Sequence, residues 1–164
     1  MNEVRYAKLC DRPDVLPVGR PRGAKALGTR YERAVALAIP NAFHGPWFQY
    51  WGDGGLRYCQ PDFLFESEYD PGPIVCLEVK HTWLPYAHVQ LEGLYGPVVR
   101  CATEREVVGV VVAKRLTDGM GGLAVVNCMT EALWAARRGY RVVLHWLGVS
   151  AAPLQVPGLV SPQF

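Results

Sequence analysis

Apolar residues recur along the chain at two spacings, one typical of helices and one typical of strands. Between Tyr31 and Ala38 they follow the helical spacing, which predicts a helix over residues 28–39 with Thr29 as its N-cap. The segment from Ile74 to Val79 predicts a strand with Val75, Leu77 and Val79 on the face toward the core and Cys76, Glu78 and Lys80 on the other face. Both spacings therefore occur in one short chain.

The remaining apolar runs extend this mixture of helices and strands. The β-branched run Val107–Ala113 predicts a strand covered on both faces, and Gly139 is expected to end the last helix. The other predicted elements are strands over residues 47–51, 57–65 and 140–149 and helices over 85–95 and 130–138. Their order predicts a single α/β domain with a central mixed β-sheet flanked by helices.

Both ends of the chain differ from this pattern. Residues 1–27 are rich in Pro, Gly and Arg, and we expect them to form a basic N-terminal arm without regular structure. Residues 150–164 form an apolar, Pro-rich tail, which we also expect to be irregular. Because the tail is so apolar, we expect it either to cover the domain's own sheet or to contact a second copy of the chain.

Composition narrows the class of protein. The chain has 164 residues, 50% of them hydrophobic, and a net charge of +2, which favours a folded domain with a substantial core over intrinsic disorder. No signal peptide or membrane span is visible, so we expect a cytoplasmic protein without a membrane partner. The five cysteines are scattered and lack metal-ligand spacing, which favours reduced, buried thiols.

Charge is distributed unevenly along the chain. Residues 1–60 carry a net charge of +4, residues 61–99 carry −5 and residues 100–164 carry +3. Chance clustering on a solvated surface produces such blocks as well. An acidic centre between basic flanks is nevertheless what a protein needs if it holds a metal ion and contacts phosphates.

The candidate chemistry lies in the acidic block. Glu78 and Lys80 are two residues apart on a predicted strand, so their side chains project from the same face. Asp62 lies near the end of the preceding strand and would lie beside Glu78 if these two strands pair. Two neighbouring carboxylates are suitable ligands for Mg²⁺ or Mn²⁺. The alternative is an ordinary ion pair on a surface hairpin.

Three segments carry a resemblance to a known family. Pro61-Asp62, followed by Glu78-Val79-Lys80, resembles the motif of the PD-(D/E)xK nuclease superfamily, whose fold is a restriction-endonuclease-like core. The segment from Gly28 to Arg33, with Glu32, resembles the start of the first helix in archaeal-type Holliday junction resolvases. Gln90 resembles a glutamine that several branches carry on the following helix. The resemblance spans about residues 25–95 and implies a nuclease domain over residues 28–149.

The resemblance also implies a role for each of these residues. Asp62, Glu78 and the carbonyl of Val79 would bind the catalytic Mg²⁺ or Mn²⁺, and Glu32 would bind it through water or hold a second ion. Lys80 would orient the attacking water, and Gln90 would support Lys80 or touch the scissile phosphate. The implied reaction is hydrolysis of DNA phosphodiester bonds.

Basic residues outside the motif are candidates for DNA contacts. Such contacts to phosphates would recognise DNA by its shape rather than its sequence, since no base-reading helix is visible. We expect a homodimer acting on four-way junctions, as the resemblance to junction resolvases implies. The candidate DNA-binding residues are Arg20, Arg22, Lys25, Arg30, Arg33 and Arg57.

Three alternatives compete with a resolvase. The first is another PD-(D/E)xK nuclease, such as a 5′→3′ exonuclease or a repair or restriction-type enzyme. The second is a non-catalytic DNA-binding module of the same fold. The third is a structural α/β protein in which the Glu78–Lys80 ion pair has no catalytic role.

Overall fold

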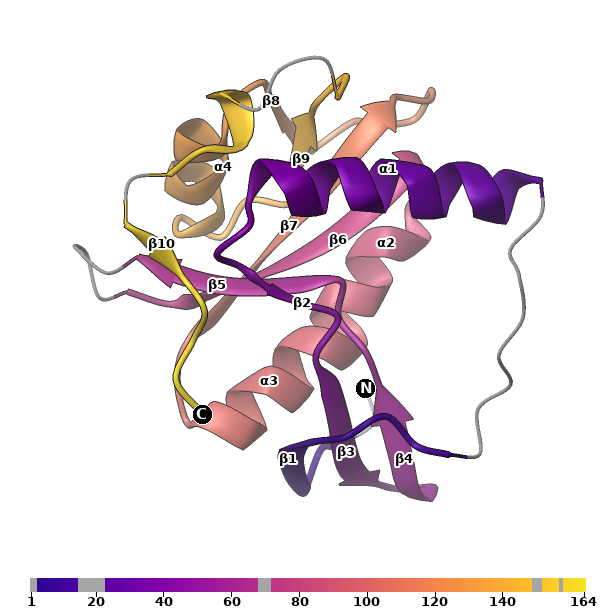
Figure 1. The fold of residues 1–164 in the computed structure, drawn as a ribbon, viewed down its shortest axis with the longest axis vertical. Coiled ribbons are helices and arrows are strands. Elements are labelled where there is room, and N and C mark those ends of the chain that lie inside the picture. Colours follow the sequence, from indigo (N-terminus) through magenta and orange to yellow (C-terminus); the bar gives the residue numbers. More distant parts are fainter. Residues whose placement is uncertain (1–2, 15–22, 68–71, 149–151, 157) are drawn as a thin grey trace.

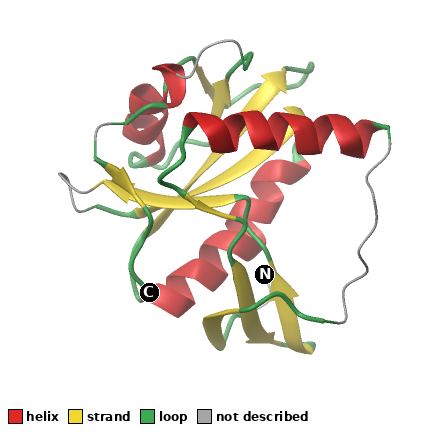
Figure 2. Cartoon of the chain, in the orientation of Figure 1, coloured by secondary structure: helices red, strands yellow, loops and turns green. Residues whose placement is uncertain are grey.

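The computed structural model describes residues 3–14, 23–67, 72–148, 152–156 and 158–164 and shows an α/β domain with two sheets (Figure 1). Helix α1 (Ala24–Ala38) crosses the main sheet, and the small antiparallel sheet lies at the opposite end of the molecule. Figure 2 shows the same arrangement by secondary structure, with helices around a central group of strands. The predicted single α/β domain with a mixed central sheet is confirmed.

The main sheet has the order β10-β5-β6-β7-β9-β8, and β2 pairs with β5 beside this row. Strand β5 is antiparallel to β6, whereas β6, β7, β9 and β8 run parallel to one another. The strands are β2 (Phe43–His44), β5 (Phe63–Ser67), β6 (Ile74–Thr82), β7 (Val107–Arg115), β8 (Ala124–Val126), β9 (Val142–His145) and β10 (Leu159–Val160).

Both faces of the main sheet are covered. Helices α1 and α4 (Met129–Ala136) pack on one face, where Val35 and Met129 share a buried cluster with Leu77. The other face is covered by one continuous helical segment, made of α2 (Tyr86–Gln90), the π-helix η1 (Leu91–Tyr95) and α3 (Gly96–Thr103). There Leu91 and Val98 share a second buried cluster with Cys76.

This covering changes the expected environment of the predicted strand 74–79. The alternation indicated a half-buried strand, but β6 is longer and buried on both faces over Ile74–Val79. Cys76 and Glu78 therefore point into a second core rather than into solvent. The expected strand 107–113, covered on both faces, is confirmed within β7, because Val110, Val111 and Val112 are all fully buried.

The small sheet corrects the expectation for the chain's first residues. Strand β1 (Tyr6–Cys10) pairs with β3 (Trp47–Gly52), which pairs in turn with β4 (Gly55–Cys59). Residues 6–10 are thus a strand within the segment predicted to lack structure. The predicted strand 57–65 is also two strands, β4 and β5, and Pro61 lies between them. A proline has no N–H for a ladder bond, which accounts for the break.

Helix boundaries differ from the predicted ones in places. Helix α1 begins at Ala24 rather than residue 28, so Thr29 is interior and its hydroxyl donates to the carbonyl of Lys25. The predicted helix over residues 85–95 continues to Thr103. Gly139 follows α4 with a positive φ of 81°, as expected of a residue that ends a helix.

The C-terminal segment covers the domain's own sheet. Leu154 and Leu159 are buried, and β10 pairs with the edge of β5, so the expected irregular tail contains a short strand. The Phe164 ring lies against Phe43 and Phe48, with centroid distances of 5.8 Å to each. Of the two expected uses of this apolar segment, the structure therefore shows packing within the chain.

The described residues also test the expectations about the cysteines and about a membrane span. All five cysteines are free, but only Cys59 and Cys76 are buried, so the expectation of buried thiols holds in part. None of the helices in the described ranges has the length and apolarity needed to cross a bilayer.

The π-helix depends on a glycine. The Gly96 N–H donates to the carbonyl of Leu91, five residues earlier, rather than four as in an α-helix. A Cβ on Gly96 would lie 2.9 Å from that same carbonyl oxygen, which is closer than a side chain tolerates. Gly93, in the same turn, has open space where its Cβ would lie, with no contacting atom within 4 Å.

We therefore predict that alanine substitutions at these two glycines have opposite effects on stability. Gly96→Ala should destabilise the fold by roughly 1–3 kcal/mol, because the backbone must shift. Gly93→Ala should stabilise it by about 0.5–1 kcal/mol through helix propensity. Urea unfolding of both variants measures this difference, and a Gly96→Ala variant as stable as Gly93→Ala would contradict the assigned turn.

Candidate metal and catalytic site

The pairing of β5 with β6 brings the two predicted carboxylates together. Phe63 lies opposite Leu77, so the next position in this register places Asp62 opposite Glu78. The N–H of Val79 donates to Oδ2 of Asp62 over 2.6 Å, which fixes the Asp62 side chain at the point where β5 begins. The prediction that Asp62 lies beside Glu78 is confirmed.

Glu78 is the most unusual residue of this group, because its side chain is only 2% exposed. The Lys80 ammonium forms an ion pair with Oε1 of Glu78, and Lys80 itself is 31% exposed. The other oxygen, Oε2, is buried and has no hydrogen-bond partner in the structure. A buried carboxylate oxygen without a donor costs free energy, so this atom is suited to receive a ligand.

The surroundings of the two carboxylates raise the pKa of both. Burial and the neighbouring Glu78 charge raise the pKa of Asp62 to about 8, although the Val79 N–H opposes this rise. Burial also raises the pKa of Glu78, against the lowering effect of Lys80. Without a cation, the site therefore favours retaining a proton between the two groups. A divalent ion would neutralise both negative charges, so the site would hold the two carboxylates without that proton.

Glu32 reaches the edge of this site from α1. Its charge contributes to the raised pKa of both Asp62 and Glu78, which indicates that the three carboxylates are neighbours. Its Oε1 lies 2.8 Å from Nε2 of His44, on β2, and the His44 ring stacks on Phe63 with a centroid distance of 4.6 Å. His44 is thus a functional candidate that the sequence alone did not reveal.

Gln90 lies on the helical segment that covers Glu78. Its Nε2 donates to the hydroxyl of Tyr95 over 3.2 Å, and its Oε1 is buried without a partner. Residues five apart diverge around an α-helix but approach one another in a π-helix, so η1 makes this contact possible. Tyr95 was not predicted, and only the Gly96-Pro97 pair signals an interrupted helix there.

The residues present fit a magnesium-like ion for which the protein would supply only a few ligands and water the rest. Among the described residues, no three His, Cys, Asp or Glu side chains are grouped closely enough to hold a metal by themselves. Mg²⁺ is commonly bound through one or two carboxylates and several waters, which suits Asp62 and the unpartnered Oε2 of Glu78. The Val79 carbonyl points to the same strand edge as its N–H, toward Asp62.

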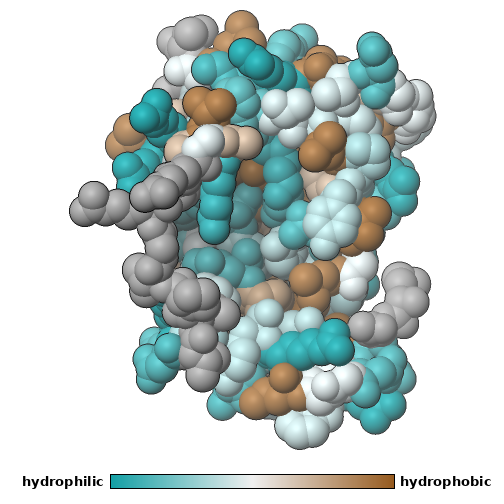
Figure 3. All heavy atoms as spheres, turned by 90° about the vertical axis from the view of Figure 1, so that its right-hand side faces the viewer, coloured by the Kyte–Doolittle hydropathy of each residue, from teal (hydrophilic) through white to brown (hydrophobic). Residues whose placement is uncertain are grey.

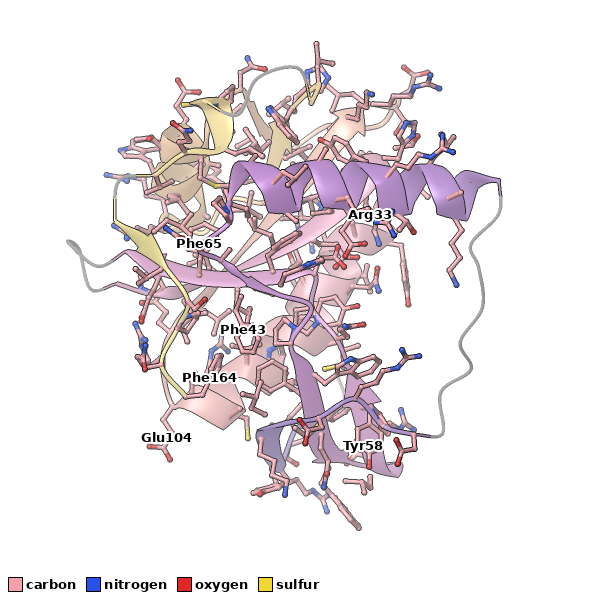
Figure 4. All side chains as sticks on the ribbon, viewed as in Figure 1. Arg33, Phe43, Tyr58, Phe65, Glu104 and Phe164 are labelled. Atoms are coloured by element: carbon pink, nitrogen blue, oxygen red, sulfur yellow. The ribbon has the colours of Figure 1, made fainter. Side chains whose placement is uncertain are left out.

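Three of the predicted DNA-binding residues lie on α1, the helix that carries Glu32, and a fourth lies on β4. Lys25, Arg30 and Arg33 lie along α1, where Figure 4 labels Arg33, and Arg57 is exposed on β4. A recess of about 200 Å³ beside α1 is lined in part by Arg30, His81 and Lys114. The candidates Arg20 and Arg22 lie outside the described residues.

The surface between the two sheets is hollowed. Figure 3 looks at the side of the molecule on which α1 begins and shows a depression lined largely by hydrophilic side chains. The depression lies between the part that carries α1 and the part that carries the small sheet.

Comparison with known proteins identifies no relative. No family model, no curated protein and no solved structure matches this chain.

We predict that Asp62 makes the metal-free protein less stable as the pH rises from about 6.5 to about 8. The unfolded Asp62 carboxyl titrates near pH 3.8 and the folded one near 8, so the folded state holds an extra proton between these values. Stability is therefore lost as the pH rises, by up to about 1.4 kcal/mol per pH unit. Burial lowers the pKa of His88, so the effect of His88 on stability falls below this pH range and does not overlap with that of Asp62.

Asp62→Asn should flatten this dependence, whereas Asp118→Asn, an exposed loop control, should leave it unchanged. Thermal unfolding in EDTA at several pH values measures how stability changes with pH. Identical slopes of stability against pH in the wild type and Asp62→Asn would disprove the raised pKa of Asp62.

Proposed function

We propose that this protein is a metal-dependent DNA endonuclease of the PD-(D/E)xK type, with a restriction-endonuclease-like core. Within that class we propose a structure-selective Holliday junction resolvase that uses Mg²⁺ or Mn²⁺. The supporting observation is Glu78, a nearly inaccessible carboxylate with one oxygen on Lys80 and the other unpartnered beside Asp62. A surface ion pair would need neither this burial nor a second carboxylate.

Each residue of the group has a distinct role in phosphodiester hydrolysis. Asp62 and Glu78, with the Val79 carbonyl, would hold the divalent ion, and the Val79 N–H keeps Asp62 oriented for it. The ion would lower the pKa of a bound water and neutralise charge on the phosphate oxygens. Lys80 projects from the same face as Glu78, where its ammonium stabilises the extra negative charge of the pentavalent transition state.

Glu32 and Gln90 are proposed to act at the periphery of the same centre. His44 holds Glu32 at the rim, where this carboxylate can accept hydrogen bonds from water around the ion. Gln90 donates to Tyr95, and its buried amide oxygen is left without a partner, so this oxygen is the group that would accept a hydrogen bond from a water entering the site. Support of Lys80 by Gln90 stays a prediction.

Basic side chains on α1 and β4 suit contacts with a phosphate backbone. Arg30 and Arg33 on α1 and Arg57 on β4 come from two different layers of the molecule. Contacts of this kind bind DNA without reading bases, which favours recognition of a branched shape. A 5′→3′ exonuclease or a repair or restriction-type enzyme would use the same centre and is distinguished by its substrate.

We predict that the protein cleaves a four-way junction in Mg²⁺ more efficiently than linear duplex, single strand or flap. Asp62→Asn and Glu78→Gln should each lower the cleavage rate by about a hundredfold or more while retaining junction binding, because they remove metal ligands rather than DNA contacts. Gel assays of cleavage and binding on the same four substrates measure both properties.

Asp118→Asn is the matched control and should cleave like the wild type, because Asp118 is an exposed loop residue. Junction binding without cleavage by the wild type in either Mg²⁺ or Mn²⁺ would indicate the non-catalytic module instead. No binding to any DNA would indicate the structural protein.

We also predict a homodimer, since two centres would be needed to cut two strands symmetrically. Much of the apolar C-terminal segment packs within its own chain, so we place the dimer contact on another surface. Light scattering at micromolar concentration should give twice the mass of 18.2 kDa, and a monomeric mass with and without junction DNA would contradict the dimer.

A further inference from the structure

The small sheet exposes an unusual row of aromatic side chains on its outer face. Its inner face is buried, since Ala7, Phe48 and Tyr50 are at most 8% exposed. On the outer face, Tyr6 is 51% exposed, Trp51 is 49% exposed and Tyr58 is 39% exposed. Large aromatic side chains are seldom left in water together on a protein without a binding partner.

Strand register makes these side chains neighbours. Tyr6 lies directly opposite Trp51, and Tyr58 lies opposite Gln49, which is in turn opposite Lys8. Directly paired side chains in a sheet are within contact distance, and diagonal ones are within reach of aromatic rings. The outer face therefore carries three rings together with Lys8, Gln49 and the exposed Leu56, which lies opposite Trp51.

The charge of this sheet favours an anionic partner. Strands β1, β3 and β4 contain no acidic residue, and the cation Lys8 lies on the outer face, whereas Arg57 lies opposite Tyr50 on the inner side. The hairpin carboxylate Asp53 is paired with Arg5 at 3.4 Å. Rings that carry polar groups, together with a lysine and an amide, suit nucleobases and phosphates better than an aliphatic protein surface.

The aromatic face is also close to the carboxylates along the chain. Asp62 follows Tyr58, near the end of β4, by four positions, so their Cα atoms lie at most about 14 Å apart. That distance is no more than about four nucleotides at the 3.4 Å spacing of a stacked strand. Figure 4 labels Tyr58 on β4, at the end of the molecule opposite α1.

We infer that this face binds single-stranded nucleic acid by stacking bases on Tyr6, Trp51 and Tyr58. If the proposed nuclease function holds, on which this further step rests, the preferred substrate is a four-way junction that carries an unpaired strand within a few nucleotides of the cleaved phosphate. Single-strand binding itself does not depend on cleavage, because its residues are separate from Asp62, Glu78 and Lys80.

The test is binding of a labelled twelve-nucleotide oligothymidylate to the full-length protein in EDTA, followed by fluorescence anisotropy. Trp51→Ala and Tyr58→Ala should each weaken binding by about 5- to 150-fold, because each removes one stacked base. Trp51→Phe should retain most of the affinity. Lys8→Ala should reduce the salt dependence by about one phosphate contact.

Trp134→Ala is the matched control, because Trp134 is 57% exposed but lies on α4. It should bind the oligonucleotide like the wild type. Equal affinities for Trp51→Ala and Trp134→Ala, both verified as folded by circular dichroism, would overturn the inference. A loss of self-association in Trp51→Ala with unchanged oligonucleotide binding would overturn it too and identify a contact between copies.

The two proposals fail separately. If Asp62→Asn leaves cleavage intact, the nuclease site is wrong, but oligonucleotide binding in EDTA still tests the aromatic face. If cleavage behaves as proposed but the wild type cleaves a fully paired junction and one with an unpaired arm equally well, or Trp51→Ala keeps the wild-type preference for the unpaired arm, the inferred substrate class is wrong.

Discussion

Glu78 imposes the main physical constraint on this structure, because a carboxylate lies on a strand that is buried on both faces. An isolated buried charge costs several kcal/mol, so its neighbours must compensate it or it must take up a proton. Lys80 compensates one oxygen from the same strand face, but Oε2 has no partner. Asp62 adds a second negative charge from β5. The site is therefore less stable than an apolar core would be in this position.

Such a cost is characteristic of functional sites rather than of structural ones. A site built only for stability would give Oε2 a donor or replace Glu78 by an apolar residue. Instead, the N–H of Val79 orients Asp62, and His44 holds Glu32 at the rim. Both Asp62 and Glu32 are thus positioned by a neighbour, while Lys80 is the positive charge paired with this centre among the residues that the structure describes. We propose that a divalent cation would supply further positive charge there.

The sequence predicted the centre of the fold better than its edges. The β-branched run Val107–Ala113 and the alternation from Ile74 to Val79 depend on local patterns, and both strands are present. The alternation could not show that a second helical layer covers Glu78, because η1, which packs against β6, follows later in the chain. Strand β1 was missed for a similar reason: it is stabilised by pairing with Trp47–Gly52, some forty residues away.

In the candidate site, too, residues placed by local patterns were predicted and residues placed by long-range contacts were not. Asp62, Glu78 and Lys80 were predictable because antiparallel neighbours and alternate residues on a strand have fixed relative positions. His44 and Tyr95 were not. His44 meets Glu32 only because β2 pairs with β5, and Tyr95 meets Gln90 only because η1 changes the helical repeat. Contacts that depend on irregular or long-range geometry leave little trace in a single sequence.

Pro61 explains how the two halves of the molecule are coupled. By ending β4 and beginning a new strand in another sheet, it places Asp62 at the junction between the small sheet and the main sheet. A single continuous strand over residues 57–65 would have kept Tyr58 and Asp62 in the same sheet. The break lets Tyr58 belong to an exposed aromatic surface while Asp62, four residues later, faces Glu78. A base stacked on Tyr58 would therefore lie close to the carboxylates, because only a few residues of chain join the two sites.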